Sequence, residues 1–442
     1  MGCKKINKIW DYVSYIICFC LAVVVYKNGY KYIAGTILIL EGFVLYIFNF
    51  FRTKNLVDIR GLFSGSWIVG MGLSCLQLSK LQSDWKNMTW ISFFCVYFFF
   101  MIGFELTEKV ITKKEGRVKA VGTLNKDEIK AVRIMRCIIA LAGISVACFL
   151  LEAIVLGFIP LFSPEPHAYS YFHISGVHYF TVSCILIPAM TVIYTKITEN
   201  WNKKKVILLL VCNATAFVIP ILCVSRFQML FAVGFAAIIY LMLYRKITWK
   251  MIAGVILVVV PLYILLSVAR RHDVSYLNGI FEMKNSNMPI FVTQPYIYIA
   301  ANYDNFNCLV SQCSEFAHGL KMLFPVIALS GLKFIRPELA TFPLYTIKTE
   351  LTTLTIAYDA YYDFGIFGII GFAIILGIIV KKLTQWVVAS KNPVVYMFYG
   401  QVAVYFVLSF FTTWFSNPTT WFWLAITLMM YIYIGYEKKE KR

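Results

Sequence analysis

Repeated apolar runs, each about 18–22 residues long, constrain this chain more than any other feature, because a helix of that length crosses the hydrocarbon core of a bilayer. Of the 442 residues, 60% are hydrophobic and 14% are charged. A soluble protein could not bury so much apolar surface. We therefore predict an all-α polytopic membrane protein, with one integral membrane domain over residues 1–442 and about twelve transmembrane helices. The predicted helices cover residues 9–26, 32–51, 61–79, 90–107, 134–156, 177–195, 206–223, 227–244, 251–269, 357–380, 394–414 and 419–436.

The basic residues follow the positive-inside rule. The net charge is +19, which in a soluble protein would indicate a nucleic-acid partner. Most of the Lys and Arg residues, however, fall in alternate short segments between the apolar runs. Such a bias orients a membrane protein. We therefore expect both termini in the cytoplasm, a lipid bilayer as the surroundings and no nucleic acid as a partner.

One connecting segment is far longer than the others. Residues 270–356, between predicted spans nine and ten, form a long extracytoplasmic loop in this orientation. Its seven Lys and Arg residues nearly balance its six Asp and Glu residues, so it is not a generic basic patch. The residues that stand out in it are Arg270, Arg271 and His272 at its start, Asn302, Tyr303 and Asp304 in its middle, and then His318 and Arg336.

A single arginine, Arg226, stands in the apolar turn between the predicted spans 206–223 and 227–244. An arginine at membrane depth is costly and usually has a partner or a task. The alternative is a side chain that extends from a helix end to the lipid headgroups. The residues alone favour neither interpretation.

Several short motifs follow one another in a set order. They are GFIPLF at 157–162, GVHYF at 176–180, SR at 225–226, NYDN at 302–305, AHG at 317–319 and YDFGIFG at 362–368. This order resembles that of the bacterial oligosaccharide repeat-unit polymerases, the Wzy-type O-antigen and capsule polymerases. The resemblance extends over about residues 130–380.

The resemblance implies a membrane glycosyltransferase of the C-type superfamily in the bacterial plasma membrane. Such enzymes transfer a growing glycan from undecaprenyl diphosphate to a newly flipped lipid-linked repeat unit on the outer face. The implied substrates are undecaprenyl-diphosphate-linked oligosaccharides, the implied partner is a chain-length regulator protein, and neither a cofactor nor a metal is implied. Carried over by motif, Arg226, Arg270 and, more loosely, His318 are the expected catalytic residues, with Arg271 beside them.

Arginine suits the chemistry that the resemblance implies. Departure of a lipid diphosphate builds negative charge on phosphate oxygens, and fixed cationic donors in a site shielded from water stabilise that charge. Arg226, Arg270 and Arg271 would all surface at the depth of a lipid headgroup. This match in depth is the main physical argument for the assignment.

The acceptor is a sugar hydroxyl, which benefits from a general base. The candidates are His318, His272 and Asp304, and His318 comes first because Gly319 would allow close approach of substrate. An ordinary loop histidine and a turn-forming aspartate are the alternatives. Glu350, Asp359 and Asp363 could bind sugar hydroxyls, but Asp363 opens a predicted span, and a carboxylate is favoured at a helix start in any case. The residues that we expect to bind substrate are Arg271, His272, Asn302, Tyr303, Asp304 and Arg336.

Other classes remain open. A lipid-linked oligosaccharide flippase or transporter would have similar spans, but we find no internal repeat and no matched Gly- or Pro-broken helices. An O-antigen ligase-type transferase shares the scaffold, the donor and the basic residues. A metal-dependent oligosaccharyltransferase type would need acidic residues in the first outer loop, which reads KNGYK at 27–31.

Overall fold

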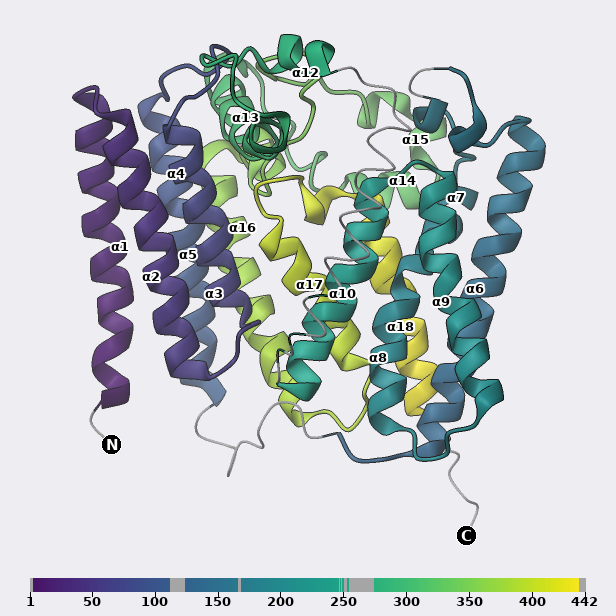
Figure 1. Cartoon of the computed structure of the whole chain (residues 1–442). Coiled ribbons are helices and arrows are strands. Elements are labelled where there is room, and N and C mark those ends of the chain that lie inside the picture. The colour runs from purple at the N-terminus through teal and green to yellow at the C-terminus, as the bar shows by residue number, and fades with distance from the viewer. Residues whose placement is uncertain are drawn as a thin grey trace. The chain divides into compact units, whose positions relative to one another are not determined.

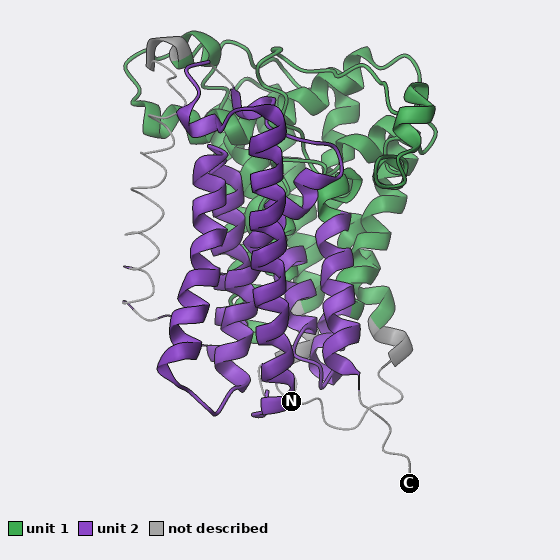
Figure 2. Ribbon diagram, turned by 90° about the vertical axis from the view of Figure 1, so that its right-hand side faces the viewer, with its two compact units in different colours: residues 1–115, 273–382, 405–420 green, residues 116–272, 383–404, 421–442 purple. Residues whose placement is uncertain are grey.

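The computed structural model describes residues 3–111, 124–165, 168–245 and 274–436, together with 247, 249 and 253. These residues form helices joined by turns and extended links, with one isolated bridge between Ser79 and Met283 (Figure 1). The all-α polytopic class predicted from the apolar runs is confirmed. The chain divides into two compact units, coloured in Figure 2, which we describe one at a time.

Unit 1 comprises residues 1–115, 273–382 and 405–420. Its long helices lie side by side, and α12 to α15 gather at the end of the unit that is opposite to the start of α1 (Figure 1). Its elements are α1 (Cys3–Lys27), α2 (Lys31–Thr53), α3 (Ile59–Phe63), the π-helix η1 (Ser64–Ile68), α4 (Val69–Cys75), α5 (Asn87–Ile111), α12 (Val274–Phe281), α13 (Ile290–Gln312), α14 (Phe324–Leu329), α15 (Leu332–Ile335), the 3-10 helices η5 (Pro337–Leu339) and η6 (Trp414–Ser416), and most of α16 (Tyr358–Ala389).

Unit 2 comprises residues 116–272, 383–404 and 421–442. It too is a bundle of long helices (Figure 2). Its elements are α6 (Glu128–Leu156), the 3-10 helices η2 (Pro160–Phe162) and η3 (Ala168–Ser170), α7 (Val177–Thr181), the 3-10 helix η4 (Val182–Leu186), α8 (Ile187–Ile197), α9 (Lys203–Leu222), α10 (Arg226–Tyr244), and most of α17 (Val395–Val407) and α18 (Pro418–Gly435).

Eight of the described helical stretches are long and apolar enough to cross a membrane. They coincide with eight of the predicted spans, and the span at 177–195 forms from α7, η4 and α8 in direct succession. Helices also lie within the other described predicted spans: α3, η1 and α4 follow one another directly in 61–79, and the last two contain α17 and α18. That these three segments cross the membrane stays a prediction. Predicted span 251–269 lies outside the described residues apart from 253. The total of twelve spans therefore stays a prediction.

Small residues set the distance between two helices of unit 1. A Cβ on Gly103 of α5 would lie 2.2 Å from Ile374 O of α16, and a Cβ on Gly377 would lie 2.2 Å from Phe100 O. Helices in a membrane associate mainly through van der Waals packing, so glycines at the contact let the backbones approach. Any larger residue at Gly103 or Gly377 would push α16 away from α5.

The segment predicted as a long loop is mostly helical where the structure describes it. α13 begins after Pro289 and packs against α4 and α5. Figure 1 shows α13 almost end-on, across the direction of the long helices of unit 1. The short helices α14, α15 and η5 and an extended stretch then lead to α16. The segment therefore covers one end of unit 1, and its place on the extracytoplasmic side stays a prediction.

Candidate functional site

The middle of α13 carries a fully buried carboxylate. Asp304 is 1% exposed. Its two oxygens accept hydrogen bonds from Trp85 Nε1 at 2.9 Å, Gln82 Nε2 at 2.8 Å and Ser74 Oγ at 3.3 Å. Burial disfavours the charged form and outweighs these donors, so the pKa of Asp304 is raised to about 7. Asp304 thus joins α13 to α4 and to the link before α5.

The two residues before Asp304 also hold α13 against the rest of unit 1. The hydroxyl of Tyr303 donates to Trp67 O at 2.8 Å. Its ring lies so close to Gly70 that a Cβ there would be 2.4 Å from the phenol oxygen. Asn302 Oδ1 accepts a hydrogen bond from Thr353 Oγ1 at 2.6 Å. The polar atoms of these three consecutive residues are thus engaged inside the protein, which gives them a structural role. Their predicted contact with sugar stays a prediction.

A tight turn after α13 is held by a second carboxylate. Asp363 accepts hydrogen bonds from the backbone N–H of Lys321 at 3.0 Å and of Met322 at 2.8 Å, and its own carbonyl accepts from the N–H of His318 at 3.2 Å. His318 and Gly319 adopt left-handed φ angles of +49° and +98°. This turn leaves the His318 side chain exposed, and its predicted contact with substrate stays a prediction.

Asp359 lies one helical turn before Asp363, and residues at i and i+4 share a helix face. Both carboxylates therefore contact the same loop turn: Asp363 binds its backbone, and Asp359 pairs with the side chain of Lys321. Lys321 Nζ lies 3.4 Å from Asp359 Oδ1, and Ser416 Oγ donates a hydrogen bond to Asp359 Oδ2. Oδ1 accepts no hydrogen bond from any described residue. It is therefore a buried acceptor that only an ion pair satisfies.

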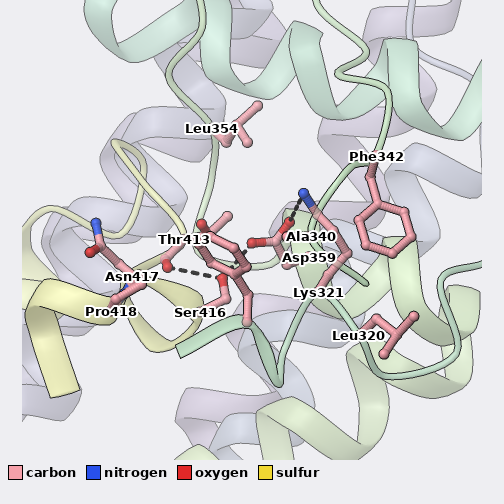
Figure 3. A pocket seen from close by; sticks show the side chains of 11 residues that line it. Leu320, Lys321, Ala340, Phe342, Leu354, Asp359, Thr413, Ser416, Asn417 and Pro418 are labelled. Atoms are coloured by element: carbon pink, nitrogen blue, oxygen red, sulfur yellow. Dashed lines mark hydrogen bonds and ion pairs between the residues drawn. The ribbon is translucent and has the colours of Figure 1, made fainter. Parts of the chain in front are cut away.

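The Lys321–Asp359 pair lines a cavity of about 250 Å³ in unit 1. Figure 3 shows the ammonium and the carboxylate facing each other, with the hydroxyl of Ser416 on the other side of the carboxylate. The remaining lining residues are Thr413, Asn417, Leu320, Phe324, Ala340, Phe342, Leu354 and Pro418.

This lining suits a polyhydroxylated ligand. A carboxylate accepts hydrogen bonds from sugar hydroxyls, while an ammonium and an amide donate to sugar oxygens. Lys321 Nζ also lies 5.8 Å from the ring centroid of Phe342 and 5.4 Å from that of Tyr362, so aromatic faces stand beside the polar groups. Small-molecule sites combine apolar walls with a few polar groups in this way.

Arg226 lies in unit 2, where it is the first residue of α10. Val224 before it adopts a left-handed φ of +54° and packs in an apolar cluster with Met229 and Leu161. The positive end of the helix dipole disfavours a cation at this position. An anion bound there would meet both the guanidinium and the helix N–H groups, which is the arrangement that a phosphate prefers.

The structure says little about the remaining predicted site residues. Arg270, Arg271 and His272 lie outside the described residues. The Arg336 side chain is 67% exposed, and its Nη1 lies 3.5 Å from Glu338 Oε1, so its binding of substrate stays a prediction. In the part of the chain that the structure describes, no three His, Cys, Asp or Glu side chains gather into a group that could hold a metal ion.

Of the residues that line the cavity, the sequence pointed only to Asp359. Lys321 stood out only as one charge among others, and Ser416 and Asn417 lie almost a hundred residues further along the chain. The available signal was the pair of aspartates four residues apart at the start of an apolar span, Asp359 and Asp363. Both carboxylates contact the turn that includes and follows the AHG motif, and only the fold shows this contact.

Helices long and apolar enough to cross a membrane define a polytopic membrane protein, and the cavity lined by an ion pair and hydroxyl groups is its candidate site. The model of the family described as "Putative O-antigen polymerase" matches residues 61–414. The chain therefore belongs to the O-antigen polymerase family, and the resemblance to Wzy-type polymerases is confirmed. No curated protein and no solved structure matches the chain.

Proposed function

We propose that this protein joins undecaprenyl-diphosphate-linked oligosaccharide repeat units into a longer polysaccharide at the outer face of the plasma membrane. Membership of the family supports a glycosyltransferase-type polymerase in general. The observation that carries the finer proposal is the cavity beside the turn at 317–322. There a buried carboxylate oxygen with no hydrogen bond from any described residue faces an ammonium in a space of about 250 Å³.

In this proposal the cavity holds sugar rings of the glycan. Asp359 Oδ1 accepts a hydrogen bond from a sugar hydroxyl, and Lys321 and Asn417 donate to sugar oxygens. Phe342 provides an apolar face against the ring carbons. A hydrogen bond to a charged group is worth about 1.5–3 kcal/mol, so two such contacts are enough to position one sugar.

The leaving group is the lipid diphosphate. The oxygen of the acceptor hydroxyl attacks the anomeric carbon of the donor glycan, the bond between that carbon and the phosphate oxygen breaks, and the diphosphate leaves with the electron pair. Arg226 and Arg270 stabilise the charge that develops on the phosphate, and Arg271 helps to bind it. One such donor lowers the activation barrier by about 3 kcal/mol.

The proton of the acceptor hydroxyl needs a base. In this proposal Asp304 is not the base, because it is buried among Trp85, Gln82 and Ser74. His318, on the exposed turn next to the cavity residue Lys321, remains a candidate.

The test removes both charges of the cavity at once, because Lys321→Ala alone would leave a buried carboxylate unpaired. We expect Lys321→Met with Asp359→Asn to lower the rate of chain lengthening at least about 10-fold, as the loss of one charged hydrogen bond predicts. The assay uses the purified protein in proteoliposomes, with a lipid extract from host cells that lack the chain as the source of lipid-linked repeat units. Lys333→Met on α15, in the same segment but outside the cavity lining, is the matched control.

Product length is read on a gel. Lengthening at the normal rate by the double variant would refute the cavity as the glycan site. Equal losses in the double variant and in Lys333→Met would also refute it, because the effect would then not be specific to the cavity.

A further inference from the structure

Unit 2 contains a buried carboxylate that the proposed function has not used. Glu152, near the end of α6, is 0% exposed. It accepts hydrogen bonds from the N–H of Ile174 at 2.9 Å, from Thr181 Oγ1 at 2.8 Å and from His178 Nδ1 at 3.1 Å. A carboxylate is costly to bury unless donors surround it. These three donors come from the residues just before α7 and from α7 itself, so they fix α7 against α6.

The contact with Glu152 also fixes the state of the imidazole. A carboxylate accepts hydrogen bonds, so Nδ1 of His178 must carry its proton, and in the neutral ring Nε2 then has a free lone pair. The His178 side chain is 28% exposed. The ring is therefore held at one nitrogen by a buried anion, and part of it is open to the surroundings.

The pair lies near the turn that carries Arg226. Leu161, which lies five residues after the end of α6, packs with Val224 and Met229. These two residues stand on either side of Arg226, the first residue of α10. The end of α6 that carries Glu152 therefore belongs to the same part of unit 2 as the arginine.

His318 lacks such support. Its ring contacts Phe364, at 6.5 Å between centroids, and within the described part of the chain no carboxylate forms a hydrogen bond or ion pair with it. A base held in one tautomer by a buried carboxylate transfers protons more effectively than a free one, because its orientation is fixed and its protonated form is stabilised. On these grounds His178 is the better general base.

We propose that His178 is the general base of the transfer and that Glu152 is its positioning residue. The inference rests on the proposed function. As the acceptor oxygen bonds to the anomeric carbon, its proton moves to His178 Nε2, and the diphosphate leaves with the electrons of the broken carbon–oxygen bond. Glu152 keeps its charge and stabilises the imidazolium that forms.

The first test is chemical rescue in the proteoliposome assay described above. Removal of a general base costs about 10²- to 10⁴-fold in rate, so we expect His178→Ala to lose at least about 100-fold. Added imidazole should restore part of the rate in His178→Ala and none in Arg226→Ala. His173→Ala is the matched control, because His173 is an exposed histidine in the same segment, and it should retain the normal rate.

His178→Gln tests the fold separately. The Gln side chain can still donate a hydrogen bond to Glu152, so this variant should keep the normal melting temperature while it loses activity as His178→Ala does. Glu152→Gln should lower kcat with little change in KM, and should add nothing to the loss already caused by His178→Ala, because the carboxylate acts through the imidazole.

Lengthening by His178→Ala or His178→Gln within threefold of the normal rate would overturn the proposal. Loss without rescue by imidazole, together with a lowered melting temperature in both variants, would also overturn it and leave the pair a structural role. Absence of lengthening by the unaltered protein in the same assay would instead refute the proposed function, so the two failures are distinct.

Discussion

Asp304→Asn should change how the stability of the protein depends on pH. The pKa of Asp304 rises from 3.8 in the unfolded chain to about 7 in the fold because of burial. The native state therefore keeps a proton that the unfolded chain has already released. This stabilisation is complete below pH 3.8, is lost as the pH rises to about 7, and stays constant above that.

The size of the effect follows from the shift. Each pKa unit corresponds to about 1.4 kcal/mol, so the full range amounts to about 4 kcal/mol. About 2 kcal/mol of it falls between pH 5 and pH 7, because the native carboxyl is only half ionised at its pKa of about 7. For a unit of this size that corresponds to roughly 6 °C in melting temperature. Asparagine cannot ionise, and its amide can still pair with Trp85, Gln82 and Ser74 after their donors reorient.

The assay is thermal unfolding of the purified protein in detergent at pH 5, 6, 7 and 8. The unaltered protein should lose roughly 6 °C more than Asp304→Asn between pH 5 and pH 7, and the two profiles should run in parallel from pH 7 to pH 8. Other titrating groups cancel in the difference because both proteins carry them. Parallel profiles over the whole range would refute the burial argument, and with it the structural role of Asp304.

Further perturbations test separate contacts. Tyr303→Phe removes the hydroxyl that donates to Trp67 O and leaves that carbonyl buried, so we expect a loss of about 1–3 kcal/mol in stability; an unchanged melting temperature would contradict the contact. Gly103→Val places a side chain against Ile374 O and should lower the yield of folded protein, whereas normal yield would show that α5 and α16 can separate. Arg226→Ala should lower chain lengthening by about 100-fold or more while the protein still reaches the membrane, and a normal rate would remove the arginine from the site. Chelators should leave lengthening unchanged, and a metal requirement would favour the oligosaccharyltransferase type.

The sequence was informative where one local property decides the outcome. Apolar runs of sufficient length become helices in a bilayer whatever their partners, so eight of the predicted spans coincide with helices able to cross a membrane. The helical span at 177–195 was predicted correctly although two α-helical segments and a 3-10 segment between them compose it. The family was also accessible, because it depends on the order of short motifs along the chain and not on contacts.

The cavity and the buried network could not be predicted in the same way. The sequence suggests an exposed loop at Asn302, Tyr303 and Asp304. In the fold, α13 directs their side chains to the interior of unit 1, where they form hydrogen bonds with Thr353, Trp67 and Trp85 respectively. Two of these hydrogen bonds join residues more than two hundred positions apart, and such contacts leave no periodic signal in the sequence. Lys321 likewise looks like an ordinary loop lysine in the sequence, and only the fold pairs it with Asp359.

The most direct test of the central claim is the length and location of lipid-linked glycan in host cells from which this chain has been deleted. Polymerisation of flipped repeat units predicts that single repeat units accumulate on lipid in the outer leaflet and that no lipid-linked polymer forms. Lipid-linked polymer of normal length would instead indicate a ligase. Single units confined to the inner leaflet would indicate a flippase, and either result would contradict the account.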